Sequence, residues 1–449
     1  MERLTVFVQE HMEDETSRLI LDRAKWPDID IETAVACIES RRKLKNKVPE
    51  WYNDPGLVFP VRLSAEQCSS TATGIYKADL AEHIAGGSFR LADLTGGLGV
   101  DSWFFSKKAS EVLYNEMQGA LCTAAGHNFR TLGVSNIKIS NLIASQETIT
   151  EILKPFAPDI VYLDPARRGE GGRKVFLIEE CTPDVLNLKD LIFKYSRHIL
   201  LKLSPMADIT MVCDRLGPTC REIHVVGAGG ECKELLVWMD REWSGEYSIT
   251  AAELPRDFPA SEAITLSYER TPLSSGHEPL ATGHEPLPRR APGDLTVISS
   301  ERSESRDLFL FEPGKAFMKA GFFNLFRDRF GIEKLGVSTH YYLTDSPEKA
   351  EELKKYGKVY SIVSIKPLDK RSIKEAGKLY PHSEVTARNI PMDTDTLRKK
   401  LGVTSGDDAH IFGLKSDLAG NLLLCTKRVF EKDLKAYGNK DEASGKFSL

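Results

Sequence analysis

The chain has 449 residues, of which 41% are hydrophobic and 28% charged, so it is long enough for about three domains with buried cores. A formal net charge of −5 argues against non-specific nucleic-acid binding by the whole chain but leaves room for a local basic face. The polar N-terminus, the absence of a membrane-length apolar run and eight cysteines without a C-x-x-C pair predict a cytoplasmic protein with no disulfide framework, metal site or membrane partner.

The first 85 residues are predicted to form a helical N-terminal region. In "LSAEQCSS", Ser64 is followed three residues later by Gln67, which matches a capping box at the start of a helix. The following residues predict one apolar helix face made of Ala72, Ile75, Tyr76 and Leu80.

Residues 86–243 alternate between short apolar runs and helical patterns. The runs "FRLADL", "EVLYNE", "IKISNL", "DIVYLD" and "HILLKLS" are typical of buried parallel strands. The segment "REIHVVGAGGECKELLVWMD" consists of two strand-like runs around a Gly-rich turn, which indicates a hairpin. We therefore expect a Rossmann-like α/β sheet that ends in an antiparallel hairpin, followed by connecting strands over 244–270.

Residues 271–305 contain "GHEPL" twice among many Pro, Gly and Ser residues, which predicts a disordered linker. After the linker, strand and helix patterns continue to residue 431 and predict smaller α+β domains. One amphipathic helix is expected over 314–331, and the later part is rich in Lys and Arg. We expect a flexible tail over 432–449.

The stretch "DLTGGLGVD" places a glycine cluster where the first strand of the sheet meets its first helix. Open α/β sheets bind their ligands at this point, and Gly96, Gly97 and Gly99 allow the backbone to approach one closely. Glu116 follows Gly96 by twenty residues and ends the second strand, where a carboxylate can accept both hydrogens of a ribose diol. The ligand is therefore expected to contain an adenosine-like ribose.

Both NAD and S-adenosylmethionine contain such a ribose. The dinucleotide fingerprint requires a third glycine where this chain has Ser102. Asp93 would repel a pyrophosphate and attract an ammonium group. The terminal hairpin is also typical of class I methyltransferases, so the sequence favours S-adenosylmethionine.

The motifs "DLTGGLGVD", "HNFRTLG", "YLDPARR", "KLSPM" and "ECKELL", in this order, resemble those of bacterial (Bacteroidetes-type) class I methyltransferase-like proteins with a C-terminal THUMP-like domain. The resemblance covers nearly the whole chain, including "EQCSS" and "ARNIPMDTDTLRKKLGV". It implies a methyltransferase core, a ferredoxin-like segment at 306–345 and a THUMP-like domain at 346–431. Because THUMP domains bind RNA, it also suggests an RNA partner, rRNA or tRNA. Where such enzymes often place an acid against the adenine amino group, this chain has Ala144, so Ser145 or a backbone group would take that place.

The segment Asp164-Pro165-Ala166-Arg167-Arg168 ends the fourth strand of the expected sheet. Amino-directed methyltransferases place a D/N-P-P-Y/F motif here, whose acid and backbone carbonyl hold an exocyclic amine in line with the methyl group. The chain lacks the aromatic residue of that motif, and an arginine would stack on the base or hold a phosphate instead. A plain helix N-cap role for Asp164 and a structural ion pair for the arginines stay open.

The motifs "TGGLGVD" and "YLDPA" are also similar to those of a small-subunit ribosomal RNA guanine-N2 methyltransferase family, which makes guanine N2 the leading acceptor. A uracil-C5 mechanism would need a cysteine nucleophile where Ser204 stands. A small-molecule or protein acceptor, and a non-catalytic binding protein, remain the alternatives. No particular oligomeric state is indicated.

The sequence thus predicts an S-adenosyl-L-methionine-dependent methyltransferase (EC 2.1.1 class) without a metal. The predicted donor-site residues are Gln67, Ser69, Asp93, Thr95, Gly96, Gly97, Gly99, Asp101, Glu116 and Ser145. The predicted catalytic residues are Asp164, Pro165, Ala166 and Arg167, and the predicted acceptor-binding residues are Arg168, Lys202, Ser204 and Pro205.

Overall fold

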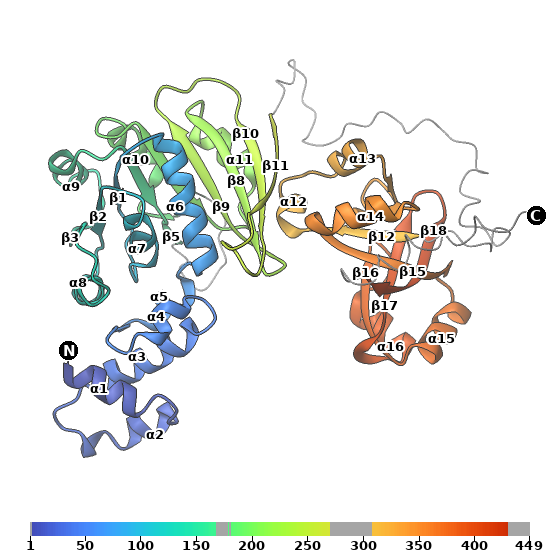
Figure 1. Cartoon of the computed structure of the whole chain (residues 1–449), viewed down its shortest axis with the longest axis horizontal. Helices are drawn as coiled ribbons and strands as arrows, with labels where there is room; N and C mark the ends of the chain where they lie inside the picture. Colours follow the sequence, from blue (N-terminus) through green and yellow to red (C-terminus); the bar gives the residue numbers. More distant parts are fainter. Residues whose placement is uncertain (1, 168–177, 179–180, 270–307, 430–449) are drawn as a thin grey trace, which may run out of the picture. The chain divides into compact units, whose positions relative to one another are not determined.

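The structure, a computed structural model, describes residues 2–167, 178, 181–269 and 308–429. Contacts along the chain divide it into two units, Met1–Pro272 and Leu273–Leu449 (Figure 1). The predicted linker at 271–305, the predicted tail at 432–449 and Arg168 lie outside the described residues.

The N-terminal region of the first unit is built from helices, as the sequence predicts. They are α1 (Glu2–Glu10), α2 (Thr16–Leu21), α3 (Ile31–Leu44), α4 (Pro49–Asn53), α5 (Arg62–Gln67) and α6 (Thr71–Ala85), with a short 3-10 turn at Arg23–Lys25. Arg41 of α3 is almost fully buried, and its guanidinium donates to the backbone oxygens of Tyr52, Asp54 and Leu57. This side chain therefore anchors the loop between α4 and α5.

The predicted helix start at Ser64 is wrong, because Ser64 lies inside α5, which ends at Gln67. The capping box is instead formed by Ser70 and Thr73 at the start of α6, where the Ser70 hydroxyl accepts from the backbone N–H of Thr73. Cys68 and Ser69, which lie between the two helices, line the first cavity described below.

The central element of this unit is a nine-stranded sheet with the order β11-β10-β8-β9-β7-β4-β1-β2-β3 (Figure 1). The strands are β1 (Arg90–Asp93), β2 (Glu111–Asn115), β3 (Ile137–Ser140), β4 (Ile160–Leu163), β7 (His198–Leu203), β8 (Cys220–Ala228), β9 (Glu231–Asp240), β10 (Ser248–Leu254) and β11 (Ile264–Glu269). From β3 to β7 neighbouring strands are parallel, whereas β9 pairs antiparallel with both β7 and β8. The Rossmann-like sheet with a terminal antiparallel hairpin is confirmed, and β10 and β11 extend it beyond that hairpin.

Helices α7 (Val100–Ser106), α8 (Gly119–Thr131), α9 (Ile149–Phe156), α10 (Val185–Ile192) and α11 (Ile209–Leu216) connect these strands. Helices α6 and α7 share one buried apolar cluster with β1, β2 and β4. They approach closely at Gly74, where a Cβ atom would lie 2.2 Å from the ring of Phe104. The N-terminal helical region is thus joined to the sheet through α6.

The second unit holds a seven-stranded sheet with the order β13-β14-β12-β15-β18-β17-β16. Its strands are β12 (Phe309–Pro313), β13 (Glu333–Lys334), β14 (Tyr342–Thr344), β15 (Gly357–Pro367), β16 (His382–Arg388), β17 (Thr404–Ser416) and β18 (Gly420–Arg428), and its helices are α12 (Lys315–Lys319), α13 (Leu325–Phe330), α14 (Pro347–Leu353), α15 (Lys370–Leu379) and α16 (Thr394–Leu401). The single helix expected over 314–331 is wrong, because Gly321 has a positive φ of 79° and separates α12 from α13. Among the described residues, no helix is long and apolar enough to cross a membrane.

Candidate functional site

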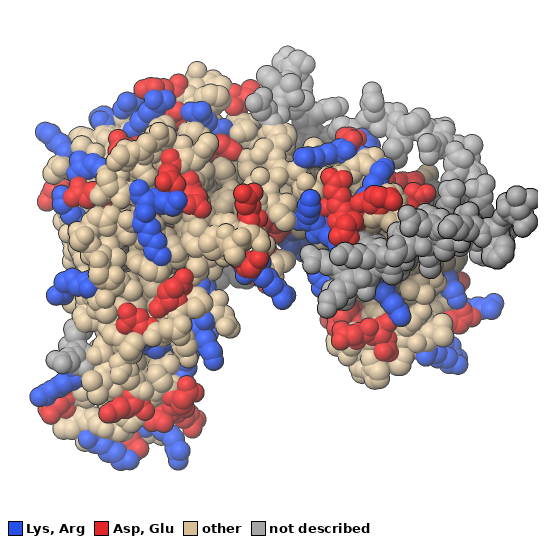
Figure 2. Space-filling model, viewed as in Figure 1, with Lys and Arg blue, Asp and Glu red and all other residues tan. Residues whose placement is uncertain are grey.

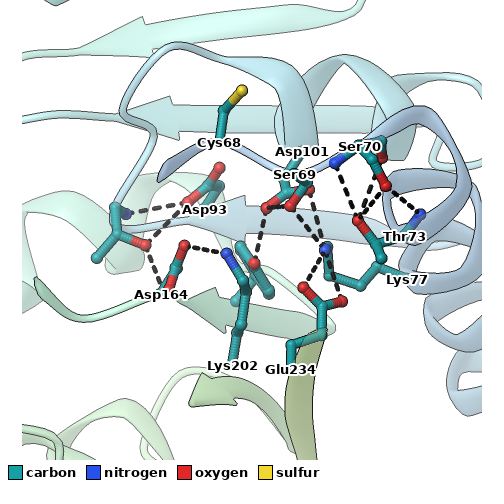
Figure 3. A network of polar contacts seen from close by, with 12 residues as sticks. Cys68, Ser69, Ser70, Thr73, Lys77, Asp93, Asp101, Asp164, Lys202 and Glu234 are labelled. Atoms are coloured by element: carbon teal, nitrogen blue, oxygen red, sulfur yellow. Dashed lines mark hydrogen bonds and ion pairs between the residues drawn. The ribbon is translucent and has the colours of Figure 1, made fainter. Parts of the chain in front are cut away.

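A cavity of about 330 Å³ opens where the carboxyl ends of β1, β2 and β4 meet the N-terminus of α7. Gln67 at the end of α5 and the two residues after it form part of its wall. Cys68 and Ser69 are drawn in Figure 3. This is the position at which open α/β sheets bind ligands, as the glycine cluster predicts.

The glycine turn packs directly on the side chain of Tyr114. A Cβ atom at Gly96 would lie 2.2 Å from the Tyr114 ring, and the Tyr114 hydroxyl donates to the Gly97 oxygen at 2.6 Å. Gly97 and Gly99 have φ angles of 52° and 93°, which side-chain-bearing residues rarely adopt. Glycine is therefore required in this turn both by space and by backbone conformation.

Glu116 lies just after β2 at the cavity and is 7% exposed. One of its carboxylate oxygens accepts from the N–H of Gly97 at 2.9 Å and the other from the N–H of Gln118 at 2.8 Å. Each oxygen keeps a further lone pair, so the held carboxylate can accept hydrogen bonds from a diol at the cavity wall.

Asp93, at the end of β1, is 1% exposed and already engaged by neighbouring groups. It accepts from the Ser102 hydroxyl at 2.6 Å and from the Thr95 N–H at 3.0 Å. Burial raises its pKa to about 7, because the loss of hydration of the carboxylate outweighs the hydrogen bonds from Ser102 and Thr95, which lower the pKa. Asp93 therefore carries less negative charge near neutral pH than an exposed carboxylate.

A second cavity of about 500 Å³ lies on the other side of Asp164. Residues that line both cavities are Leu63, Gln67, Asp164 and Ala166. The predicted acceptor-side residues Pro165, Lys202, Ser204 and Pro205 line the second cavity. A group bound in one cavity would thus be separated from a group in the other only by this shared wall.

Asp164 is held from two directions. Its backbone N–H donates to the Thr95 hydroxyl oxygen at 2.7 Å, and its Oδ2 accepts from Lys202 at 2.5 Å. Burial by itself lowers the pKa of Lys202, but the carboxylates of Asp164, Glu234 and Asp101 raise it above its ordinary value, so Lys202 remains charged. The N-cap role left open for Asp164 is wrong, because the short strand β5 (Ala166–Arg167) follows it instead of a helix.

The structure brings most of the predicted donor-site residues together around the first cavity. Those that line it are Gln67, Ser69, Asp93, Thr95, Gly96, Gly97, Gly99, Asp101 and Glu116. Ser145 is not among the lining residues, and its hydroxyl donates to Glu147 at 2.6 Å. Residues 142–144 line the cavity instead. Arg167 pairs with Cys181 of β6 (Cys181–Thr182) and lines neither cavity.

A buried ionic network beneath the cavities was not predicted. Lys77 of α6 has no exposed surface, and its Nζ donates to Glu234 of β9 at 2.8 Å and to Ser69 at 2.8 Å. The ammonium also lies 3.3 Å from Oδ1 of Asp101 (Figure 3). The one signal in the sequence that could have indicated this network is Glu234, a charged residue directly before the apolar run LLVWM of β9.

Comparison with known proteins agrees with this geometry. Residues 309–350 match a family described as a ferredoxin-like domain, and residues 357–427 match a family described as THUMP domain-like. The crystal structure of a candidate methyltransferase from Porphyromonas gingivalis W83 has a TM-score of 0.75 and 27% identity, with 95% of this chain and 98% of that chain covered. No curated protein matches the chain in sequence.

Two further structures overlap with smaller parts of the chain. An rRNA methylase from Streptococcus thermophilus has a TM-score of 0.28 and 10% identity over 37% of this chain and 94% of that chain. An RNA methyltransferase candidate from Pyrococcus horikoshii has a TM-score of 0.25 and 17% identity over 35% of this chain and 72% of that chain. The sheet order and the whole-length neighbour show that the chain has the fold of a class I methyltransferase, and the two family matches add a ferredoxin-like and a THUMP-like C-terminal part, as its motifs predicted.

Proposed function

We propose that the protein is an S-adenosylmethionine-dependent methyltransferase that acts on RNA, on an exocyclic base amine such as guanine N2. The observation that carries this proposal is the wall shared by the two cavities. Asp164 and Ala166 line both, so a methyl donor in the first cavity and an acceptor base in the second would meet at the Asp164-Pro165 motif.

The first cavity suits the donor in hydrogen bonding and in charge. Glu116 supplies acceptor oxygens for a ribose diol, and Gly97, where a Cβ atom would meet only the Thr95 oxygen at 3.7 Å, leaves room for close approach of the ligand. Asp101 and Glu116 add negative charge, which complements a ligand with a sulfonium and an ammonium group. When bound, S-adenosylmethionine would supply the electrophilic methyl group.

The second cavity fits an amine acceptor. Lys202 occupies Oδ2 of Asp164, whereas Oδ1 accepts no hydrogen bond from the described residues. In this role Oδ1 accepts one amine hydrogen and thereby directs the nitrogen lone pair at the donor. The nitrogen would form its bond to the methyl carbon as the carbon–sulfur bond breaks, and the surplus proton on the methylated nitrogen would pass to solvent. In this role Asp164 positions the acceptor and takes up no proton.

An RNA acceptor is supported by the THUMP domain-like match and by the surface of α15 and α16. Gly377 allows α15 to pack against the backbone of Leu401 at the end of α16. The exposed lysines on these two helices are Lys370, Lys374, Lys378, Lys399 and Lys400. Other basic residues of this part are paired with acids, Lys366 and Arg371 with Glu375. Figure 2 shows acidic and basic side chains interspersed over the visible face, so RNA contact would be local.

The decisive experiment incubates purified protein with tritium-labelled methyl donor and total RNA from cells that lack the gene. We expect label in RNA with the wild type and none with Asp164→Ala, while the exposed Asp190→Ala serves as a matched control and keeps activity. Absence of label from RNA, in protein that binds the donor, would contradict the RNA proposal and favour a small-molecule or protein acceptor.

A further inference from the structure

We propose that Lys77, which lines neither cavity, creates a subsite for an ammonium group in the first cavity. It does so by fixing which way the Ser69 hydroxyl donates and by holding Asp101 in place. The inference rests on the proposed function, since it assigns the amino-acid end of the donor to this wall. It makes Lys77 a positioning residue that acts through two side chains lining the cavity.

The ammonium of Lys77 is fully committed within the protein. Its Nζ donates to Ser69 Oγ at 2.8 Å and to the Glu234 carboxylate at 2.8 and 3.1 Å, and it lies 3.3 Å from Asp101 Oδ1 (Figure 3). The side chain has no exposed surface. Lys77 therefore cannot reach into the cavity to bind the carboxylate of a donor, and any effect must pass through its partners.

Lysine can only donate hydrogen bonds, and this property orders the rest of the network. Because Ser69 Oγ accepts from Lys77, its own proton points elsewhere, and it goes to Asp101 Oδ2 at 3.0 Å. The hydroxyl of Tyr162 also donates to Asp101 Oδ2, at 2.8 Å. The protons of Ser69 and Tyr162 are thus both directed at Asp101 and away from a ligand.

Neither hydroxyl proton is therefore available to a ligand. Oδ1 of Asp101 is buried and Oδ2 already accepts from Ser69 and Tyr162, so Asp101 contributes its negative charge, whereas Ser69 Oγ keeps one lone pair for a hydrogen-bond donor in the cavity. An ammonium group is donor-only and positively charged, so it is complementary to Ser69 in hydrogen bonding and to Asp101 in charge. Burial alone would raise the pKa of Asp101, but Lys77 and Lys202 hold it below its ordinary value, which keeps the carboxylate ionised.

This assignment differs from the expectation that Asp93 attracts the ammonium. Asp93 accepts from Ser102 and Thr95, is 1% exposed, and has a pKa that burial raises to about 7. Near neutral pH Asp101 carries more negative charge than Asp93, because the buried ammonium of Lys77 lies 3.3 Å from its carboxylate and stabilises the ionised form.

The test measures binding by calorimetry and requires no catalytic activity. The two ligands are S-adenosylhomocysteine and its analogue in which hydrogen replaces the amino group. We expect the wild type to bind the amine-bearing ligand at least about 10-fold more tightly, as charge-assisted hydrogen bonds imply. In Ser69→Ala and in Lys77→Met/Glu234→Gln this ratio should fall to about 1–3.

The double substitution is chosen because Lys77→Met alone would leave Glu234 buried without its cation. Ser69→Ala is a small change that keeps the Lys77–Glu234 pair, so it tests the same subsite in a protein that folds. Tyr76→Phe is the matched control, because it removes a hydrogen bond to His224 from the same helix, away from the cavity, and should keep the full ratio.

The outcomes test separately whether the ammonium subsite exists, whether Lys77 forms it, and whether the proposed function holds. A wild type that binds both ligands equally would overturn the ammonium subsite, and a ratio that survives in both variants would overturn the role of Lys77. If the variants lose affinity for both ligands to the same extent, Lys77 has a purely structural role, and this result would also overturn the inference. If neither ligand binds the wild type, the proposed function itself fails.

Discussion

The ammonium nitrogen of Lys202 lies 2.5 Å from Oδ2 of Asp164, in the wall that separates the two cavities. The two residues come from the ends of β7 and β4, which are adjacent parallel strands. The ion pair occupies one carboxylate oxygen and leaves the other to an acceptor. Under the proposed function Lys202 would orient Asp164, and the predicted direct contact of Lys202 with the acceptor is the alternative that the next experiment tests.

Replacing Lys202 by Met should lower kcat for methyl transfer by about 10-fold or more, because Asp164 would lose the contact that fixes its carboxylate plane. Affinity for S-adenosylhomocysteine should change little. Steady-state kinetics with calorimetry of the donor product checks this, and Lys233→Met, on the rim of the same cavity, is the control. A rise in KM with unchanged kcat would instead show that Lys202 binds the acceptor.

The stability of the protein should depend on pH through Asp93. Its pKa is raised from 3.8 to about 7, so between these values the folded state holds a proton that the unfolded chain has released. The contribution of this group to stability is greatest below pH 3.8 and declines as pH rises to 7, by about 4 kcal/mol in total at about 1.4 kcal/mol per unit. Asp93→Asn should therefore gain stability relative to the wild type between pH 4 and 7. Urea denaturation across this range tests it, and parallel stability curves for the two proteins would contradict it.

Gly96→Ala should destabilise the protein by about 1–3 kcal/mol, because the new methyl group would collide with the Tyr114 ring at 2.2 Å. Gly87→Ala is the matched control, since a Cβ atom there meets nothing within 4 Å, and it should change stability by less than about 0.5 kcal/mol. Chemical denaturation measures both. Equal stability of the two variants would show that the turn can move away from Tyr114.

Arg41→Lys should destabilise the N-terminal helices by about 2 kcal/mol or more, although the charge is kept. The guanidinium fork reaches the backbone oxygens of Asp54 and Leu57, both at 2.7 Å, and a single ammonium cannot satisfy the same set of carbonyls. Thermal unfolding of the variant should be compared with Arg130→Lys, an exposed arginine that donates to one carbonyl of its own helix. Similar melting temperatures for both variants would rule out the anchoring role of Arg41.

Much of the sheet and the donor turn could be predicted from the sequence, because both depend on local patterns. Buried parallel strands require continuous apolar runs, and a turn that approaches a ligand requires glycine. The segment "FRLADL" therefore predicts the first strand, and "TGGLG" predicts the turn after it. The place of Glu116 after the second strand followed from the same pattern. The helix starts were less certain. Ser64 and Ser70 both precede a suitable partner by three residues, and only the structure shows that α5 continues through Ser64 and that α6 begins after Ser70.

The ionic network beside the first cavity was decided by tertiary structure alone. Lys77 and Glu234 are 157 residues apart, and neither residue by its local sequence indicates the other. A lysine in an amphipathic helix is ordinarily solvated, because burying its charge is costly unless an anion is placed beside it. The sequence by itself determined the strands, the glycine turn and the acid at the end of β2. The packing of α6 against the sheet decided which charges meet, because only folding brings a buried cation within reach of Ser69 and Asp101.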